Sequence, residues 1–188
     1  FDLQQTEQIF ASAKANGLPI KCHAEQLSNM GASYLAAQYQ ALSCDHLEFL
    51  DEKAAMEMAK NNTIAVLLPG AYYFTGEKQK PPIELLRTAG VKMAVASDAN
   101  PGTSPIYSML DIMNMGCCLF SLTSQEALQA VTVHAAQALD LAHEVGRIAP
   151  GFIADLILWS IDDADLLCYY LGFPLEHRLM IAGQWVNE

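Results

Sequence analysis

The sequence is poor in basic residues and lacks any long apolar run. Its 188 residues include 10 Lys and Arg against 21 Asp and Glu, which gives a formal net charge of −11 at pH 7. This negative charge repels nucleic acid and anionic membrane surfaces, so we expect neither as a partner. No apolar run in the sequence approaches the ~20 residues that a membrane-spanning helix needs.

Several motifs that would identify a chemistry are also absent. The sequence contains no GxGxxG, no phosphate-binding P-loop and no GxSxG, so dinucleotide-binding, nucleotide-binding and serine-hydrolase functions have no support. The five cysteines form no CxxC pair, and their odd number argues against a disulfide framework: Cys22, Cys44, Cys117, Cys118 and Cys168. We expect free thiols in a reducing cytoplasm, with the adjacent Cys117 and Cys118 buried as small hydrophobic side chains.

Hydrophobic residues are abundant, and short runs of them recur at regular intervals along the chain. Hydrophobic residues make up 52% of the chain, which is enough to bury a core. Short apolar runs that indicate strands end near His23, His46, Pro69 and Asp98. The intervals of 23, 23 and 29 residues between these ends (23 to 46, 46 to 69, 69 to 98) are typical of βα units. The near-continuous apolar strands predict a parallel sheet that is covered on both faces.

Helical patterns and turn residues complete the predicted organisation. Helices are predicted at residues 2–16, 31–41, 51–62, 81–90, 106–117 and 124–141, with a loop at 70–80. Asp51 is a predicted helix cap, and Thr123 with Glu126 fits a capping box. Beyond residue 146, short apolar segments between Gly turns predict a small antiparallel β unit. We therefore divide the chain into an α/β unit at 1–145 and a C-terminal β segment at 146–188.

Three of the four predicted strand ends carry side chains suited to chemistry: His23, His46 and Asp98. The carboxyl ends of parallel strands meet at one edge of a sheet, where active sites collect. An imidazole can bind a metal or carry a proton, and a carboxylate can bind a metal or act as a base. Each residue also has a structural interpretation, since a histidine at a strand end is often a hydrogen-bonded core or rim residue and Asp98 begins a D-x-N-P-G turn. His46 could also belong to a surface polar cluster with Asp45 and Glu48. As a set in matching register they favour a site.

The remaining histidines and the methionines favour structural roles. His134 lies in a helical run and is predicted to be structural, whereas His143 and His177 lie in polar surroundings and are predicted to be solvated. Met109, Met113 and Met115 are predicted to fill the core.

Longer segments around these strand ends carry a family resemblance. KCHAEQLSNMGASYLAAQYQALSCDHLEF, AVLLPGAYYF and VASDANPGTSP together resemble the imidazolonepropionases, the ring-opening hydrolases of histidine degradation. GRIAPGFIADLILW is similar to the C-terminal β signature of the wider amidohydrolase superfamily. The resemblance extends over essentially the whole chain. It departs at His134 and Asp140, where the superfamily usually has Asn and Gly.

The resemblance implies a fold and a reaction. The fold is α/β, with this chain as the C-terminal half of a (β/α)8 TIM-type barrel (strands five to eight) plus part of a small β-sandwich. The reaction is the metal-dependent hydrolysis of the cyclic amide of 4-imidazolone-5-propanoate to N-formimidoyl-L-glutamate. The implied cofactor is one divalent metal ion, zinc or iron, because mixed His and Asp ligation suits both.

The resemblance also implies roles for single residues. His23 resembles a metal ligand, and Asp98 resembles a second ligand that also accepts the proton of the attacking water. His46 resembles the histidine that polarises the carbonyl and stabilises the oxyanion. Positions matching the family's contacts to substrate or product are Gln26, Asn100, Gly102 and Thr103. At Gly102, the lack of a Cβ would let a ligand approach closely.

Some features of the family are not found in these residues. The sequence has no His-x-His pair, which supplies two further metal ligands in the superfamily, and the carboxylate-binding arginine of the family belongs to its N-terminal half. We expect the chain to be the C-terminal portion of such an enzyme, itself inactive and weak in metal affinity. It would then associate with the missing half or with itself, and the family suggests dimers. Two alternatives are another amidohydrolase, such as a cyclic-amidine deaminase, and a non-catalytic half-barrel that serves in assembly.

Overall fold

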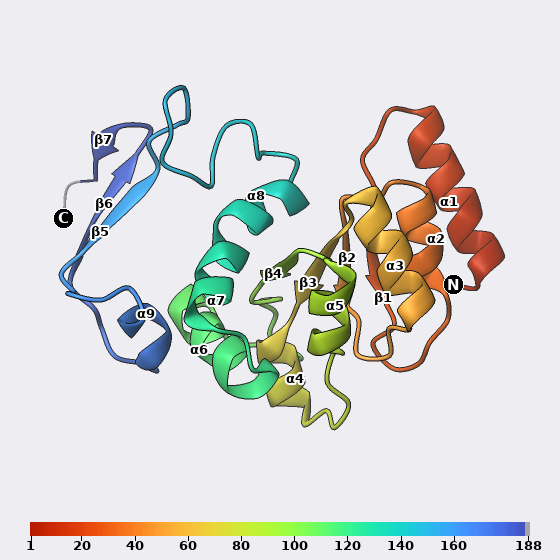
Figure 1. Ribbon diagram of the computed structural model, residues 1–188, viewed down its shortest axis with the longest axis horizontal. Helices are drawn as coiled ribbons and strands as arrows, with labels where there is room; N and C mark the ends of the chain where they lie inside the picture. The colour runs from red at the N-terminus through yellow and green to blue at the C-terminus, as the bar shows by residue number, and fades with distance from the viewer. Residues whose placement is uncertain (187–188) are drawn as a thin grey trace.

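The four predicted strands form one parallel sheet in the computed structural model, which describes residues 1–186 (Figure 1). The strands are β1 (Lys21–Ala24), β2 (Ser43–His46), β3 (Ile64–Leu67) and β4 (Met93–Val95). They pair in sequence order, and Cys22 lies beside Cys44 and Cys44 beside Ala65. The predicted succession of βα units is therefore confirmed.

Helices cover one face of this sheet and enclose the main core. Between and before the strands lie α1 (Leu3–Ala15), α2 (Ala32–Gln38), α3 (Glu52–Asn61) and α5 (Ile83–Ala89). The predicted cap of α3 is present, because the Asp51 carboxylate accepts a hydrogen bond from the Ala54 amide at 2.8 Å. Gly90 ends α5 in the left-handed conformation, with φ of 77°. Local sequence signals thus fix the ends of these helices.

The second face of the sheet is covered unevenly. On β3 and β4 it is apolar, and Ile64, Val66 and Ala94 cluster with Ala138. On β1 the residues alternate, with Lys21 and His23 exposed and the residues that follow each of them buried. The expectation of a sheet covered on both faces is therefore wrong for β1, since this edge strand carries polar side chains on the open face.

Two stretches between the predicted elements have a different structure. The predicted loop at 70–80 begins with a helix, α4 (Pro69–Thr75), because Pro69 at the first helical position suits a helix start. Gly70 belongs to this helix, and a Cβ there would lie 2.9 Å from Ser104 Oγ. The predicted helix at 124–141 is divided at Thr132 (φ −119°, ψ −91°) into α7 (Ser124–Val131) and α8 (Val133–Ala138).

The C-terminal residues form a second, antiparallel sheet, as predicted. It contains β5 (Leu156–Trp159), β6 (His177–Ile181) and β7 (Gln184–Trp185), in that order. In Figure 1 this sheet lies at the opposite end of the molecule from α1, and α6 (Met109–Phe120) and α9 (Leu166–Tyr169) lie between it and the first sheet. The division at 145/146 stays a prediction, and residues 187–188 of that segment lie outside the described residues.

Burial corrects two predictions for single side chains. Cys118 is exposed, because it follows Cys117 on the helix and faces away from the core against which α6 packs. Met113 is buried as predicted and Met115 packs against the core, whereas Met109 at the start of α6 is 39% exposed. Among residues 1–186, no helix combines the length and apolarity needed to cross a membrane.

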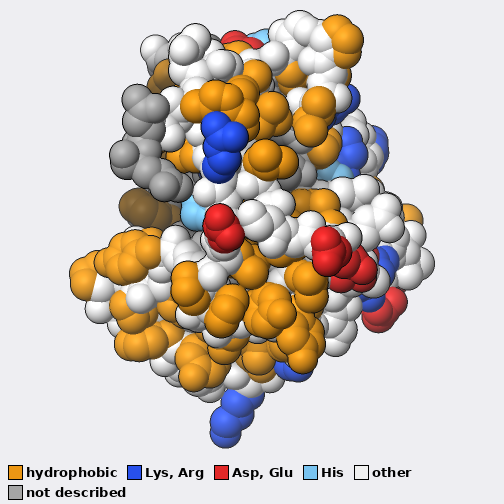
Figure 2. Space-filling model, turned by 90° about the vertical axis from the view of Figure 1, so that its left-hand side faces the viewer, with side chains coloured by type: hydrophobic (Ala, Val, Ile, Leu, Met, Phe, Trp, Pro, Cys, Tyr) orange, Lys and Arg blue, Asp and Glu red, His pale blue; other side chains and the backbone are white. Residues whose placement is uncertain are grey.

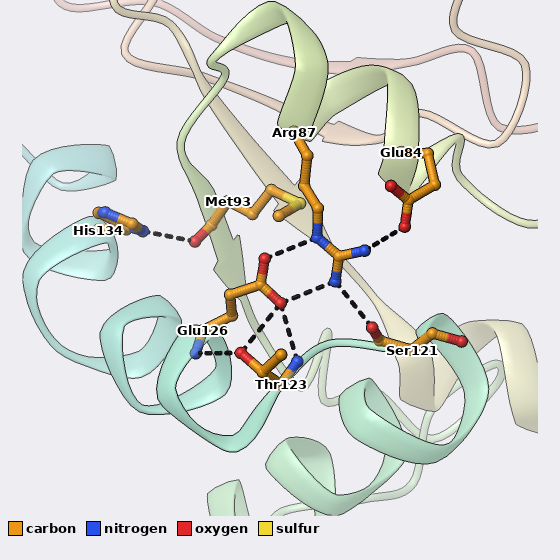
Figure 3. A network of polar contacts seen from close by, with 7 residues as sticks. All are labelled: Glu84, Arg87, Met93, Ser121, Thr123, Glu126 and His134. Atoms are coloured by element: carbon orange, nitrogen blue, oxygen red, sulfur yellow. Dashed lines mark hydrogen bonds and ion pairs between the residues drawn. The ribbon is translucent and has the colours of Figure 1, made fainter.

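An ion pair joins α5 to α7 (Figure 3). Arg87 binds the Glu126 carboxylate with two hydrogen bonds of 2.7 Å each, and its Nη2 also donates to the Ser121 carbonyl at 2.7 Å. Glu126 completes the predicted capping box by accepting the Thr123 amide at 2.8 Å. The bond to Arg87 lowers the pKa of Glu126 to about 2. Bidentate geometry makes this a strong surface pair.

Glu126→Gln is expected to lower the free energy of unfolding at pH 7 by roughly 1–2 kcal/mol, because glutamine keeps the cap but loses the ion pair. The pKa of Glu126 is about 2 folded against 4.5 as the ordinary value. The stabilisation is therefore complete above about pH 4.5 and is lost as the pH falls toward 2. Urea unfolding at pH 7 and pH 3 measures this difference. Glu84→Gln, at the exposed partner of Arg87, is the control and should change little.

Candidate active site

The histidines at the ends of β1 and β2 lie against each other. The ring centroids of His23 and His46 are 4.3 Å apart, with 49° between the ring planes. In the sheet, His23 is in register with Asp45, and His46 with Ala24. Strict alternation would turn His46 toward the opposite face from His23. His46 instead has a φ of 79°, and this left-handed turn brings the two rings together.

Left-handed backbone recurs where the strands end. Glu25, His46, Leu47 and Asp98 have φ values of 52°, 79°, 72° and 48°. Such conformations are unfavourable for residues other than glycine and persist only where the surroundings impose them. Two of these four positions are candidate site residues from the sequence, so backbone strain is concentrated at this edge of the sheet.

Glu25 holds the turns that follow β1 and β2 together. Its buried carboxylate accepts the backbone amides of Ala32 at 2.8 Å and Ser33 at 3.0 Å, at the start of α2. Its carbonyl accepts the Phe49 amide at 2.8 Å. Sequence reasoning missed Glu25. The available signal was an acidic residue between a strand end and a helix start, where carboxylates pair with free amides.

Glu48 is a second residue that sequence reasoning did not assign to the site, and its pairing with His46 is buried where the alternative interpretation placed both on the surface. Its Oε1 lies 3.7 Å from Nδ1 of His46, and the two side chains are 1% and 5% exposed. Nδ1 of His46 and Oε2 of Glu48 have no hydrogen-bond partner in the described structure. Buried polar atoms without partners are uncommon, and they often mark a functional site. The available signal in the sequence was an acidic residue two positions after the strand-end histidine.

The environment of His23 favours its neutral form. Partial burial of the ring lowers its pKa below the ordinary value, and the neighbouring His46 lowers it further. The negative charges of Asp45, Asp98 and Glu48 act in the opposite direction. These carboxylates are therefore close enough to His23 to influence its protonation. A neutral imidazole is the form that binds a metal.

Lys21 anchors the polar face of the sheet below His23. Its Nζ donates to Ser43 Oγ at 2.6 Å and to the Ala138 carbonyl at 3.0 Å. Ser43 in turn donates to Asp45 Oδ1 at 2.8 Å. This chain of hydrogen bonds ties the open face to the end of α8 and fixes the carboxylate beside His23.

The loop after Asp98 is closed by Asn100. The Asn100 amide donates to the Asp98 carbonyl at 2.7 Å, and its Oδ1 accepts the amides of Gly102 and Thr103 at 2.9 and 2.8 Å. These are the contacts of the turn that the D-x-N-P-G pattern indicates. A Cβ at Gly102 would lie 3.4 Å from Asn100 Oδ1. The candidate site residues between positions 98 and 103 thus lie in one compact turn.

Gln26 lies apart from that turn. With His23 it lines an open groove of about 620 Å³ beside β1, together with Phe1, Phe10 and Met30. The groove residues do not include the 98–103 turn. His23 therefore contacts His46 and also lines the groove that contains Gln26.

The other histidines lie outside this site. His134 Nδ1 is 2.9 Å from the Met93 carbonyl, which confirms the structural role predicted for it (Figure 3). His143 is exposed and pairs with Glu144 at 3.1 Å, and His177 is exposed and packs on Trp159. Within residues 1–186, no group of three or more His, Cys, Asp or Glu side chains is arranged to hold a metal ion.

Comparison with known proteins places these features in a family. The amidohydrolase family model matches residues 1–166. The chain belongs to the amidohydrolase family. This amidohydrolase is 60% identical over 187 residues to the imidazolonepropionase of Legionella pneumophila (strain Corby). The match covers all of this chain and 46% of that protein. It is 55% identical to the imidazolonepropionase of Psychromonas ingrahamii, covering 47% of that protein. The chain thus spans about half the length of the curated relatives it matches.

Solved structures show that the amidohydrolase fold is shared. An adenosine deaminase from Xanthomonas campestris with bound zinc matches with a TM-score of 0.79 at 17% identity, over 96% of this chain and 48% of that one. Escherichia coli guanine deaminase matches with a TM-score of 0.76 at 17% identity, over all of this chain and 52% of that one. The α/β fold predicted from the sequence is therefore confirmed, and it corresponds to about half of each of these proteins.

Proposed function

We propose that this chain supplies part of the active site of an imidazolonepropionase. The reaction would hydrolyse the cyclic amide of 4-imidazolone-5-propanoate to N-formimidoyl-L-glutamate in the cytoplasm. The observation that carries the proposal is the 60% identity with the Legionella pneumophila protein of that name. The strand-end geometry supports it, because the imidazoles of His23 and His46 are in contact and the negative charge of Asp98 acts on the pKa of His23.

The same proposal includes the architecture of the whole enzyme. The strands β1 to β4 would be strands five to eight of a (β/α)8 barrel, and the C-terminal sheet would be part of a composite β-sandwich. Two observations support this. The sheet is parallel throughout, and within the described residues β1 and β4 each pair with one neighbour only. A barrel closes such edges.

Asp98 and His46 carry out different parts of the proposed reaction. Asp98 accepts the proton of the attacking water and later delivers it to the ring nitrogen that leaves. His46 donates an N–H to the carbonyl oxygen as negative charge develops on it. Glu48 lies beside Nδ1 of His46, so Nε2 is the nitrogen that faces the substrate in this scheme. Glu48 thereby positions the ring.

The substrate contacts follow the two loops of the site. Gln26 contacts the substrate from the groove beside His23. The turn at 100–103 holds the product, and Asn100 acts by shaping this turn, because its side chain already bonds the amides of Gly102 and Thr103. Thr103 and the backbone of Gly102 would then meet the ligand.

A divalent metal ion, zinc or iron, fits the donors at this edge of the sheet. His23 in its neutral form and the Asp98 carboxylate would hold it, and the remaining ligands would come from residues outside this chain. When bound, such an ion would lower the pKa of a coordinated water toward ~7, which would supply a nucleophile at neutral pH. The zinc in the Xanthomonas campestris deaminase of the same fold supports this class of ion.

A chimaeric enzyme tests the proposal. This chain would replace the matching segment of the Legionella pneumophila imidazolonepropionase, and the loss of 4-imidazolone-5-propanoate would be followed by its absorbance. We expect turnover comparable to that of the parent protein. A correctly folded chimaera that is inactive on this compound but hydrolyses or deaminates a purine or pyrimidine would favour another amidohydrolase activity. A folded chimaera with no activity on any of these substrates would favour a non-catalytic module.

The 188-residue chain alone is expected to bind zinc weakly and to show no turnover, because only two proposed ligands lie within it. It is also expected to self-associate. Figure 2 shows hydrophobic side chains gathered over the face that carries α9, where Tyr169, Leu171 and Phe173 are 73%, 60% and 58% exposed. Metal analysis, the hydrolysis assay and light scattering measure these properties. Robust hydrolysis or a monodisperse monomer would contradict the prediction.

A further inference from the structure

Two cysteines far apart in sequence pack together where α9 meets α6 (Figure 1). Cys117 lies on α6 and is partly buried, and Cys168 lies on α9 and is 7% exposed. They belong to one apolar cluster that also contains Met113, Ala127 and Leu167. The two thiols are hydrogen-bonded to each other. Neither takes part in the proposed hydrolysis, so the pairing calls for a separate account.

Polar contacts fix the position of Cys168 over α6. Asn114, one helical turn before Cys117, donates from its Nδ2 to the Cys168 carbonyl at 2.8 Å. Asp111, one turn earlier, accepts the Gly172 amide at 2.8 Å. On the other side, the Cys168 thiol lies 3.9 Å from the carbonyl oxygen of Ser124 at the start of α7. The sulfur of Cys168 is therefore held between α6 and α7, in the apolar cluster against which Cys117 packs.

The hydrogen bond makes the two thiols chemically unequal. The thiol of Cys117 donates to the sulfur of Cys168, which lowers the pKa of Cys168, although burial acts against this. The same bond and burial raise the pKa of Cys117. A thiolate is the form that reacts with oxidants.

We propose that Cys117 and Cys168 are a modification site, at which a peroxide converts the thiol pair into a disulfide that fastens α9 to α6. Hydrogen peroxide oxidises the Cys168 sulfur to a sulfenic acid and is itself reduced to water. The Cys117 sulfur then attacks the sulfenic sulfur. The S–S bond forms, the S–O bond breaks, and the hydroxyl leaves as water with the proton of Cys117.

The disulfide would change how the C-terminal sheet is attached. The segment from 160 to 176 joins β5 to β6 through α9, and α9 is a single short helix of four residues. A covalent link across this contact restricts the opening of α9, since the ends of a closed loop of chain cannot separate. Oxidation is therefore expected to protect this segment from proteolysis.

The test is treatment of the 188-residue chain with hydrogen peroxide, followed by thiol titration and peptide mapping without reductant. We expect the loss of two of the five free thiols and a peptide pair joined through Cys117 and Cys168. Dithiothreitol should restore both thiols. Limited proteolysis between 160 and 176 should be slower in the oxidised chain and should recover after reduction.

Three variants separate this pair from other thiol chemistry. Cys118→Ser removes the exposed neighbour and should leave the cross-link intact. Cys117→Ser and Cys117→Ala should each abolish it, with circular dichroism confirming that the variants fold. A disulfide that includes Cys118, a cross-link between two chains, or full retention of five thiols under conditions that oxidise free cysteine would overturn the proposal. Activity of the chimaera does not enter these readouts, so they are independent of the proposed hydrolysis.

Discussion

Asp98→Asn in the chimaeric enzyme is expected to lower turnover of 4-imidazolone-5-propanoate by about two to four orders of magnitude, the usual contribution of a general acid–base group. Asparagine is close to aspartate in size, but it carries no charge and cannot accept the proton of the attacking water. Asparagine also tolerates the left-handed backbone of position 98, where φ is 48°. The fold should therefore survive while the chemistry is lost.

Asp140→Asn is the matched control for this variant. Asp140 is likewise an exposed aspartate in left-handed conformation, with φ of 60°, and it lies beyond the end of α8, away from the strand ends. It should retain parental turnover. Metal content measured beside the rates separates the two roles proposed for Asp98, since a loss of rate at full metal occupancy points to proton transfer. Unchanged turnover in Asp98→Asn would remove Asp98 from both roles.

The features that could be predicted from the sequence depend on neighbours along the chain. The Asp51 cap and the Thr123–Glu126 capping box are formed within four residues, and both are present. The strands follow from apolar runs and their spacing. The strand-end positions of His23 and His46 follow from the same reasoning, because parallel strands in register end at one edge.

What could not be predicted depends on contacts between distant segments. The bond of Arg87 to Glu126 crosses from α5 to α7. The left-handed turn at His46 has no glycine to signal it, and the Leu47 amide that follows it bonds the Ala24 carbonyl of the neighbouring strand at 3.1 Å. The partners of a buried carboxylate cannot be read from its position in a sequence, so the contacts of Glu25 and Glu48 became visible only in three dimensions.

Glu25→Ala is expected to lower the free energy of unfolding of the 188-residue chain by roughly 3 kcal/mol. Glu25 is 4% exposed, and its removal leaves the buried amide of Ser33 and the partly buried amide of Ala32 without partners. Hydrogen bonds to a charged group contribute about 1.5–3 kcal/mol each, and an orphaned buried amide adds a desolvation cost. Urea unfolding followed by circular dichroism measures the change.

The same substitution distinguishes a positioning residue from a merely stabilising one. Glu25 ties the turn after His23 to the start of α2 and, through its carbonyl, to Phe49 beyond His46. In Glu25→Ala the imidazole NMR signals of His23 and His46 should therefore shift, while that of exposed His143 should not. Glu25→Gln keeps one acceptor oxygen and should retain about half of the lost stability. Glu52→Ala, at an exposed glutamate in the first turn of α3, is the control and should cost only about 0.3–1 kcal/mol. If Glu25→Ala unfolds no more easily than Glu52→Ala and leaves both site histidines unmoved, Glu25 does not position the site.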